Sequence, residues 1–173
     1  MVEIVQEGNK TLRKIAKEVP VSEIKSIKIQ KILKDMNEAL DSQNDGVAIA
    51  APQIDVSLRI FIVSGRVFDK EFMDGISNFQ SIKTHTNLCF INPIITKISK
   101  DKKIMDEGCL SVRPIYGKVR RATRATVEAY NEKGEKFKMD GSGLLAHIFQ
   151  HETDHLEGIL FTDKAKDLRE ILQ

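Results

Sequence analysis

The amino-acid sequence predicts an α+β fold, in which antiparallel or mixed β-sheets pack around a central helix, with one helix near the N-terminus and a short helix at the C-terminus. Apolar residues recur at helical spacing near both ends of the chain, and short strand patterns lie between them. Strands and helices do not alternate regularly, as they would in a parallel α/β sheet. The 173 residues suit one compact domain, residues 1–173, able to bury roughly 70% of the surface of the unfolded chain.

The first predicted element is an amphipathic helix over roughly 23–42, with Ser22 as its N-cap. Its apolar residues at helical spacing are Ile29, Ile32, Leu33, Met36 and Leu40. The stretch GVAIAAPQ (46–53) then breaks the helical pattern, and LRIFIVSG (58–65) has the composition of a short buried strand. The loop that carries Gln53 is therefore expected to lie against a sheet.

The middle of the chain predicts a long loop followed by strands. Residues 65–87 follow neither the helical nor the strand period and predict a surface loop with one irregular turn. LCFINPIITKIS (88–99) predicts a strand in which Pro93 marks a sheet edge or a bulge. KVRRATRATVEAYNEKGEKFKM (118–139) predicts two strands joined by a hairpin at NEKG.

Two helices are predicted after this hairpin. GSGLLAHIFQHETDHLEG (141–158) predicts the central helix, from an N-cap at Ser142 to a stop at Gly158. Its apolar residues are Leu144, Leu145, Ile148 and Phe149. A short amphipathic helix at about 163–173 closes the chain. It is based on Ala165, Leu168, Ile171 and Leu172.

Composition excludes several broad classes of protein. With 41% hydrophobic and 30% charged residues and a net charge of +2, the chain has no general attraction to DNA or to a membrane surface. No apolar run approaches the ~18 residues of a membrane span, and MVEIVQEGNK is neither a secretory signal nor a transit peptide. Two cysteines are too few for a disulfide framework. A cytoplasmic protein is expected.

The motif QHETDHLEG (150–158) carries the chemistry of the chain. His151 and His155 are four residues apart, so one helix face brings both imidazoles within reach of one metal ion. Glu152 is rotated by about 100° from His151, where a carboxylate can act as general base on water held by the ion. The motif predicts a metal hydrolase.

The third metal ligand decides the class of hydrolase. In the metzincin pattern a third histidine would follow, but Phe161 holds that position and cannot bind a metal. A gluzincin-type site would need a carboxylate from the short remaining chain: Asp163, Asp167 or Glu170. The better donor is Cys109, which follows Gly108 in DEGCLSV. A thiolate with two imidazoles suits one divalent ion: Fe(II), Zn(II), Co(II) or Ni(II).

Three stretches together resemble one family. GVAIAAPQ, EGCLS and QHETDH are similar, in order and in spacing, to the GxGxAAPQ, EGCLS and QHExDH motifs of the peptide deformylases. The resemblance covers about residues 5–165. It implies an enzyme that removes the formyl group from the N-terminal formylmethionine of new polypeptides, with Cys109, His151 and His155 as ligands of a metal that is usually Fe(II).

The resemblance also implies roles for residues outside the metal ligands. Glu152 would take a proton from the attacking water and later deliver one to the departing amine. The side-chain amide of Gln53 and the backbone N–H of Leu110 would stabilise the negative charge that grows on the formyl oxygen.

The N-formylmethionyl peptide would bind as an added strand between the first two motifs. Backbone partners are then expected at Val47, beside Gly46, and at Gly108. An apolar pocket for the methionine side chain is expected from Val47, Leu144 and Ile148. Glu107 would orient its loop or line this pocket.

Three residues depart from the family pattern. Ala48 replaces the second glycine of the first motif, and its methyl group could narrow the approach of the substrate backbone. His147 occupies an apolar pocket position and could alter the pocket or the choice of metal, although a hydrogen-bonded structural histidine is favoured. Arg113 stands directly after CLSV, where the family commonly has proline, and Pro114 follows it. This difference would reshape the rim of the pocket.

Three further interpretations stay open on the sequence alone. The basic residues Arg113, Lys118, Arg120, Arg121 and Arg124 predict a solvated strand face, with transient contact to ribosomal RNA as the alternative. A metallopeptidase that cuts internal peptide bonds and a catalytically silent metal- or peptide-binding module are the rival functions. A monomer is assumed.

Overall fold

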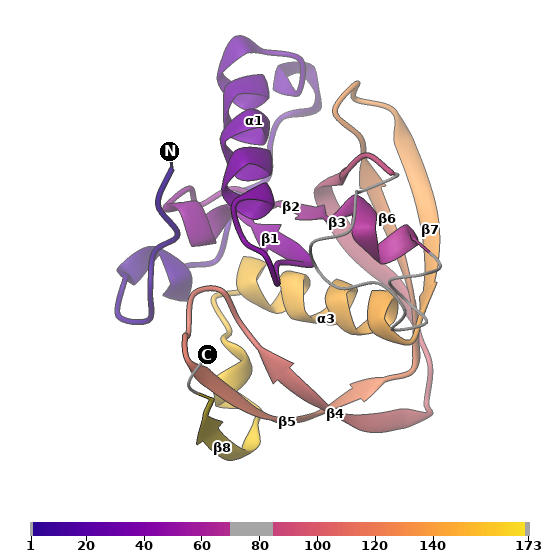
Figure 1. The fold of residues 1–173 in the computed structure, drawn as a ribbon. Helices are drawn as coiled ribbons and strands as arrows, with labels where there is room; N and C mark the ends of the chain where they lie inside the picture. Colours follow the sequence, from indigo (N-terminus) through magenta and orange to yellow (C-terminus); the bar gives the residue numbers. More distant parts are fainter. Residues whose placement is uncertain (1, 70–84, 172–173) are drawn as a thin grey trace.

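A computed structural model describes residues 2–69 and 85–171 of the chain. Its α-helices are α1 (Ile27–Asp41) and α3 (Leu144–Leu156). The strands are β1 (Ala48–Ala50), β2 (Ile60–Val63), β3 (Leu88–Ile98), β4 (Lys102–Gly108), β5 (Ile115–Ala122), β6 (Arg124–Tyr130), β7 (Lys136–Ser142) and β8 (Lys166–Glu170). They form two antiparallel sheets with α3 between them, which confirms the predicted α+β class (Figure 1).

The larger sheet has the strand order β1-β2-β3-β6-β7. The register of β3 against β6 shifts between Ile91 and Ile94, and Asn92 has a φ of 51°. This irregularity confirms the bulge predicted around Pro93. The hairpin at NEKG is also confirmed, since β6 and β7 pair from Tyr130 with Lys136 to Arg124 with Ser142.

The two helices cover opposite faces of this sheet. Alternate residues of β1 to β3, such as Ile62 and Ile91, pack with α1, whereas Phe61 and Phe90 pack with Phe149 of α3. The sheet is therefore buried on both faces at β2, which explains why IFIV is continuously apolar.

The smaller sheet has the order β4-β5-β8 and lies on the other side of α3 (Figure 1). The prediction of two strands over 118–139 was incomplete here, because 118–122 belong to β5 and only the strand from Arg124 onward joins the hairpin. Strands β1 and β4 were not predicted.

The predicted C-terminal helix over 163–173 is wrong. A 3-10 turn at Phe161–Asp163 leads into β8, which pairs with the edge of β5. Leu168 packs on Gly117, and a Cβ at residue 117 would lie 2.8 Å from a methyl group of Leu168. A short isolated helix is marginal in water, so pairing with a free strand edge outweighs the helical spacing. Residues 172 and 173 of the prediction lie outside the described part.

Helix ends also differ from the prediction. The N-terminal helix begins after Ser26, whose hydroxyl accepts from the Ile29 N–H at 3.3 Å, and Ser22 lies in a preceding 3-10 turn. The central helix begins after Gly143, and Ser142 ends β7. Gly158 does follow its C-terminus, with a φ of 72°.

The prediction of a loop with one turn over 65–87 can be compared with the structure only at its ends. A 3-10 turn at Gly65–Phe68 begins it, and residues 70–84 lie outside the described part. Neither α1 nor α3, the α-helices of the described residues, has the length and apolar character of a membrane span.

Candidate metal centre and active site

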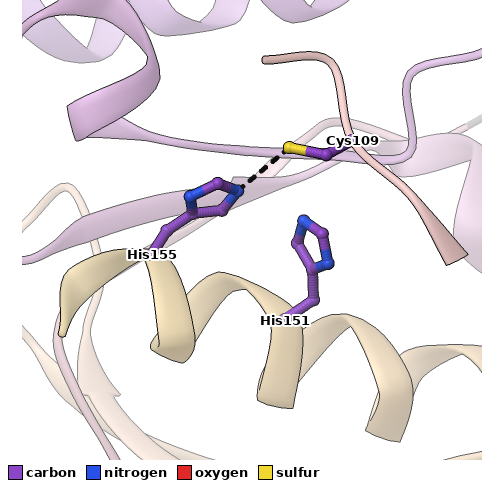
Figure 2. Close-up of side chains that lie close together, drawn as sticks. All are labelled: Cys109, His151 and His155. Carbon is purple, nitrogen blue, oxygen red and sulfur yellow. Dashed lines mark hydrogen bonds between the residues drawn. The ribbon is translucent and has the colours of Figure 1, made fainter. Parts of the chain in front are cut away.

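Cys109, His151 and His155 converge at one point between α3 and the end of β4 (Figure 2). Their ligand atoms all lie within 4.8 Å of one another, and the Cys109 Sγ lies 3.2 Å from the His155 Nε2. His151 and His155 stand one turn apart on α3, with ring centroids separated by 4.9 Å. The structure thus brings together the three ligands expected from the sequence.

Cys109 reaches the helix because β4 ends directly before it. At the last residue of β4, Gly108, a Cβ would lie 2.5 Å from the ring of Tyr116, its partner in β5. Only glycine allows the strand to approach Tyr116 so closely. The chain then turns, with the Val112 N–H donating to the Cys109 carbonyl, and the thiol faces α3.

Glu107 connects the β4 edge to α3 through both of its carboxylate oxygens. The Nδ1 of His151 donates to Oε1 at 2.5 Å, and Arg121 donates to both oxygens at 2.7 and 3.1 Å. Burial alone would raise the pKa of Glu107, but the hydrogen bonds from His147, His151 and Arg121 hold it well below its usual range. Glu107 is therefore a carboxylate that fixes the ring of His151.

The bond between His151 and Glu107 sets the chemistry of that imidazole. In its neutral form, with the Nδ1 proton donated to the carboxylate, His151 would present the lone pair of Nε2 on the side of Cys109 and His155. Glu107 was expected to orient its loop or to line the pocket, and its contact with His151 was not predicted.

Arg121 contradicts the prediction of a wholly solvated basic strand. Its side chain is 4% exposed and is bonded to Glu107 and, at 2.6 Å, to Asp154 of α3. Alternation along β5 explains the difference, because Lys118 and Arg120 face solvent whereas Arg121 faces the helix. The alternation of β5 residues could have predicted a buried Arg121 side chain. Its pairing with the carboxylates of Glu107 and Asp154 depends on how the strands and α3 pack in the fold.

His147 hydrogen-bonds to Glu107 through Nε2, as a structural histidine would. It is 5% exposed and lies one turn before His151, among the residues that line the cavity. The ring nitrogens of His147 do not belong to the cluster formed by Cys109, His151 and His155.

Glu152 is buried beside the two histidines. It is 3% exposed, and no donor among the described residues reaches its Oε2. Burial, with the nearby charge of Glu107, raises the pKa of Glu152 to about 7, against the opposing effects of His151 and Arg121. A carboxyl group with this pKa can exchange protons near neutral pH.

Gln53 has two functions in the structure. Its Oε1 accepts from the Ala50 N–H at 2.8 Å, which caps the loop and fixes the direction of the amide. The Nε2 then points at the site, 3.2 Å from the Ser111 Oγ and 3.5 Å from the Cys109 Sγ. Ser111, fully buried within the EGCLS motif, is a partner that the sequence analysis did not single out.

A cavity of about 500 Å³ opens beside these groups. Its walls include every residue predicted for the site except His155: Gly46, Val47, Gln53, Glu107, Gly108, Cys109, Leu110, Leu144, Ile148, His151 and Glu152. Asp45 and Arg113 form an ion pair of 2.5 Å in its wall, so Arg113 contributes to the cavity as its sequence position suggested. This volume is ample for one methionine side chain.

Two strand edges border the cavity. β1 and β4 are edge strands of their sheets, and the segments around Val47 and Gly108 both line the cavity. The Val47 carbonyl accepts from the Ser64 N–H within the sheet, so the alternation of an antiparallel ladder turns the backbone groups of Ala48 outward. The side chain of Ala48 is buried in the core.

The donor set fits a divalent metal ion. A tetrahedral ion with bonds of about 2.0 to 2.3 Å keeps its donors about 3.5 Å apart. The Cys109 Sγ and His155 Nε2 are 3.2 Å apart, and all three donors lie within 4.8 Å of one another. The cluster combines one sulfur and two nitrogens, the His151 ring is held by Glu107, and the buried Glu152 lies beside it.

Comparisons with known proteins give one consistent result. Residues 1–170 match the family model described as polypeptide deformylase. A peptide deformylase of Desulfitobacterium hafniense is 42% identical over 95% of this chain and 94% of its own length. One from Neisseria meningitidis is 37% identical over 98% of this chain and 90% of its own.

Solved structures agree with the sequence comparisons. The actinonin-bound class I type b peptide deformylase from Acinetobacter baumannii is 30% identical, with a TM-score of 0.80 over 96% of this chain and 99% of that one. The same enzyme bound to Met-Ala-Ser has a TM-score of 0.80 over 95% of this chain and 98% of that one, also at 30% identity.

Proposed function

The chain belongs to the polypeptide deformylase family, and we propose that Cys109, His151 and His155 hold the divalent metal ion on which its activity depends. The enzyme removes the formyl group from the N-terminus of new polypeptides. Convergence of the three donors beside a buried glutamate is the observation that supports the proposed site. When bound, the ion supplies Lewis acidity and lowers the pKa of water. Fe(II) is the expected ion, and Zn(II), Ni(II) or Co(II) suit the same donors.

Glu152 is the proposed general base and acid. Its pKa of about 7 suits both roles, because the group must take a proton from water and return one to the departing amine near neutral pH. Its burial supports this role, since the unpartnered Oε2 leaves an acceptor available for the attacking water.

Gln53 and Leu110 are the proposed donors to the formyl oxygen as it gains negative charge. The Gln53 amide is oriented in advance by its bond to Ala50, so it needs no rearrangement during the reaction. Its Nε2 lies beside Cys109, and Leu110 follows that ligand in the chain and also lines the cavity. A neutral amide donates without a change of its own charge.

The N-formylmethionyl peptide is proposed to enter as a strand between the edges of β1 and β4. Two edge strands line the cavity, which supports this proposal, and so does the neighbouring enzyme solved with Met-Ala-Ser. The backbone partner expected at Val47 moves to Ala48, because the Val47 carbonyl already accepts from Ser64 within the sheet. We therefore expect Ala48 and Gly108 to supply the backbone hydrogen bonds, beside Gly46 and Val47. Val47, Leu144 and Ile148 are the apolar wall for the methionine side chain.

Formate release tests the proposed function. The protein, purified without oxygen, is incubated with formyl-Met-Ala and with unformylated Met-Ala-Ser. We expect formate from the first and no cleavage of the second. Cleavage of the unformylated peptide would favour an endopeptidase, and no turnover with any of the four metals would favour a silent binding module.

A ribosome contact is proposed on the outer face of β5. Lys118 and Arg120 are exposed there, next to Lys166 of β8, whereas the burial of Arg121 removes it from this surface. Reversal of charge at Lys118 and Arg120 should weaken binding to ribosomes and flatten its salt dependence. The double reversal Lys25→Glu and Lys28→Glu, at exposed sites around the start of α1, is the control matched in charge. Equal binding by the reversed variant and this control would exclude the contact.

We also infer that residues 1–173 form one catalytic domain that acts as a monomer in the cytoplasm. The family match over residues 1–170 supports a single domain. The proposed metal ligands and the proposed general base, Cys109, His151, His155 and Glu152, all come from this one chain. Both cysteines are free thiols, which suits a reducing compartment.

A further inference from the structure

His147 is a buried imidazole in the cavity wall that hydrogen-bonds to Glu107. Its Nε2 bonds to the Oε2 of Glu107, and its Nδ1 is buried without a partner among the described residues. An unsatisfied buried nitrogen is costly, and an apolar side chain at this position would avoid that cost. Stability of the helix alone therefore does not explain a histidine here.

The contact with Glu107 completes a symmetrical arrangement. Each oxygen of Glu107 accepts from one imidazole and from Arg121: Oε1 from His151 and from Nη2, Oε2 from His147 and from Nε. His147 and His151 are one turn apart on α3, so both rings reach the same carboxylate. With both oxygens occupied, the carboxylate cannot rotate without breaking a bond to one of the histidines.

We propose that His147 is a positioning residue for the metal centre, acting through Glu107 on the ligand His151. It holds the far oxygen of Glu107 and so keeps the near oxygen on the Nδ1 of His151. The same contact ties the end of β4, where the peptide is proposed to bind, to α3. This inference rests on the proposed ligand set. Loss of a group that orients a metal-bound histidine typically lowers metal affinity 10- to 100-fold.

The test measures metal affinity directly, by competition with a chelator for Zn(II) and by the thiolate-to-Co(II) absorption of the Co(II) form. His147→Leu should raise the Kd for Zn(II) about 10-fold, because Arg121 still holds Glu107. His147→Gln should recover most of this loss, since its amide reaches as far as Nε2 and can donate to Glu107. If the Leu variant does not fold, His147→Asn, with a shorter amide, replaces it.

Two controls separate positioning from structure. Thr126→Val removes a buried hydroxyl from the core, one bonded to Asp140 of β7 and not to Glu107. It should lower Tm but leave the Kd for Zn(II) unchanged. In a Glu107→Gln background, His147→Leu should change the Kd less than about 2-fold, because its effect passes through the Glu107 carboxylate.

An unchanged Kd for Zn(II) in His147→Leu would overturn the inference. A changed preference between formyl-Met-Ala and formyl-norleucyl-Ala, with the Kd unchanged, would instead make His147 a part of the pocket wall. Failure of the wild-type protein to bind metal would refute the proposed ligand set, so the two failures can be distinguished.

Discussion

Replacement of Glu152 by alanine is expected to lower kcat for formyl-Met-Ala by about 10²- to 10⁴-fold while the metal stays bound. The carboxyl group is buried beside His151 and His155, and its pKa of about 7 suits transfer of a proton in both directions. It is not one of the three clustered donors, so its removal takes away proton transfer and leaves the ligands in place.

Formate release and elemental analysis on one preparation check this expectation. Glu157→Ala is the matched control, because Glu157 is exposed at the end of the same helix and pairs with Arg59 at the surface. It should retain wild-type kcat. Retention of activity in the Glu152 variant would assign the proton transfer to another group, and loss of metal from it would make Glu152 a ligand.

Replacement of Arg121 by methionine is expected to lower the free energy of unfolding by about 3 to 5 kcal/mol. The guanidinium is 4% exposed and forms hydrogen bonds with Glu107 and Asp154, so its loss leaves the buried carboxylate of Glu107 without its cation. Asp154 keeps Lys164 as a partner. The larger part of the loss in unfolding free energy is therefore expected from the broken pair between Arg121 and Glu107.

Urea unfolding of the metal-free protein measures this loss. Arg120→Met is the control, because Arg120 is the neighbouring residue of β5 but is exposed, and surface changes usually stay within about 0.5 kcal/mol. Equal stabilities for the two variants would mean that the Arg121 pairs contribute nothing to the folded state.

Local patterns in the sequence predicted the parts of the site that lie within one element. The spacing of His151 and His155 depends only on helix geometry, and α3 presents both toward Cys109 as expected. Likewise, the alternation around NEKG predicted a hairpin that the structure contains.

Contacts between distant elements could not be predicted from such patterns. The pairing of Arg121 with Glu107 depends on the register of β4 with β5, and its contact with Asp154 depends on how that sheet packs on α3. β8 was missed for a related reason, since its pairing with β5 overrides the helical spacing of Leu168 and Ile171.

The metal content of Cys109→Ser tests the central claim most directly, because that claim assigns the metal to a thiolate and two imidazoles. Wild-type protein loaded with Zn(II) without oxygen and then desalted should retain one ion per chain. Cys89→Ser, at the other, buried cysteine, should retain the same amount. We predict that Cys109→Ser retains far less than one ion per chain. Equal metal content in the two serine variants would contradict the account and remove Cys109 from the metal centre.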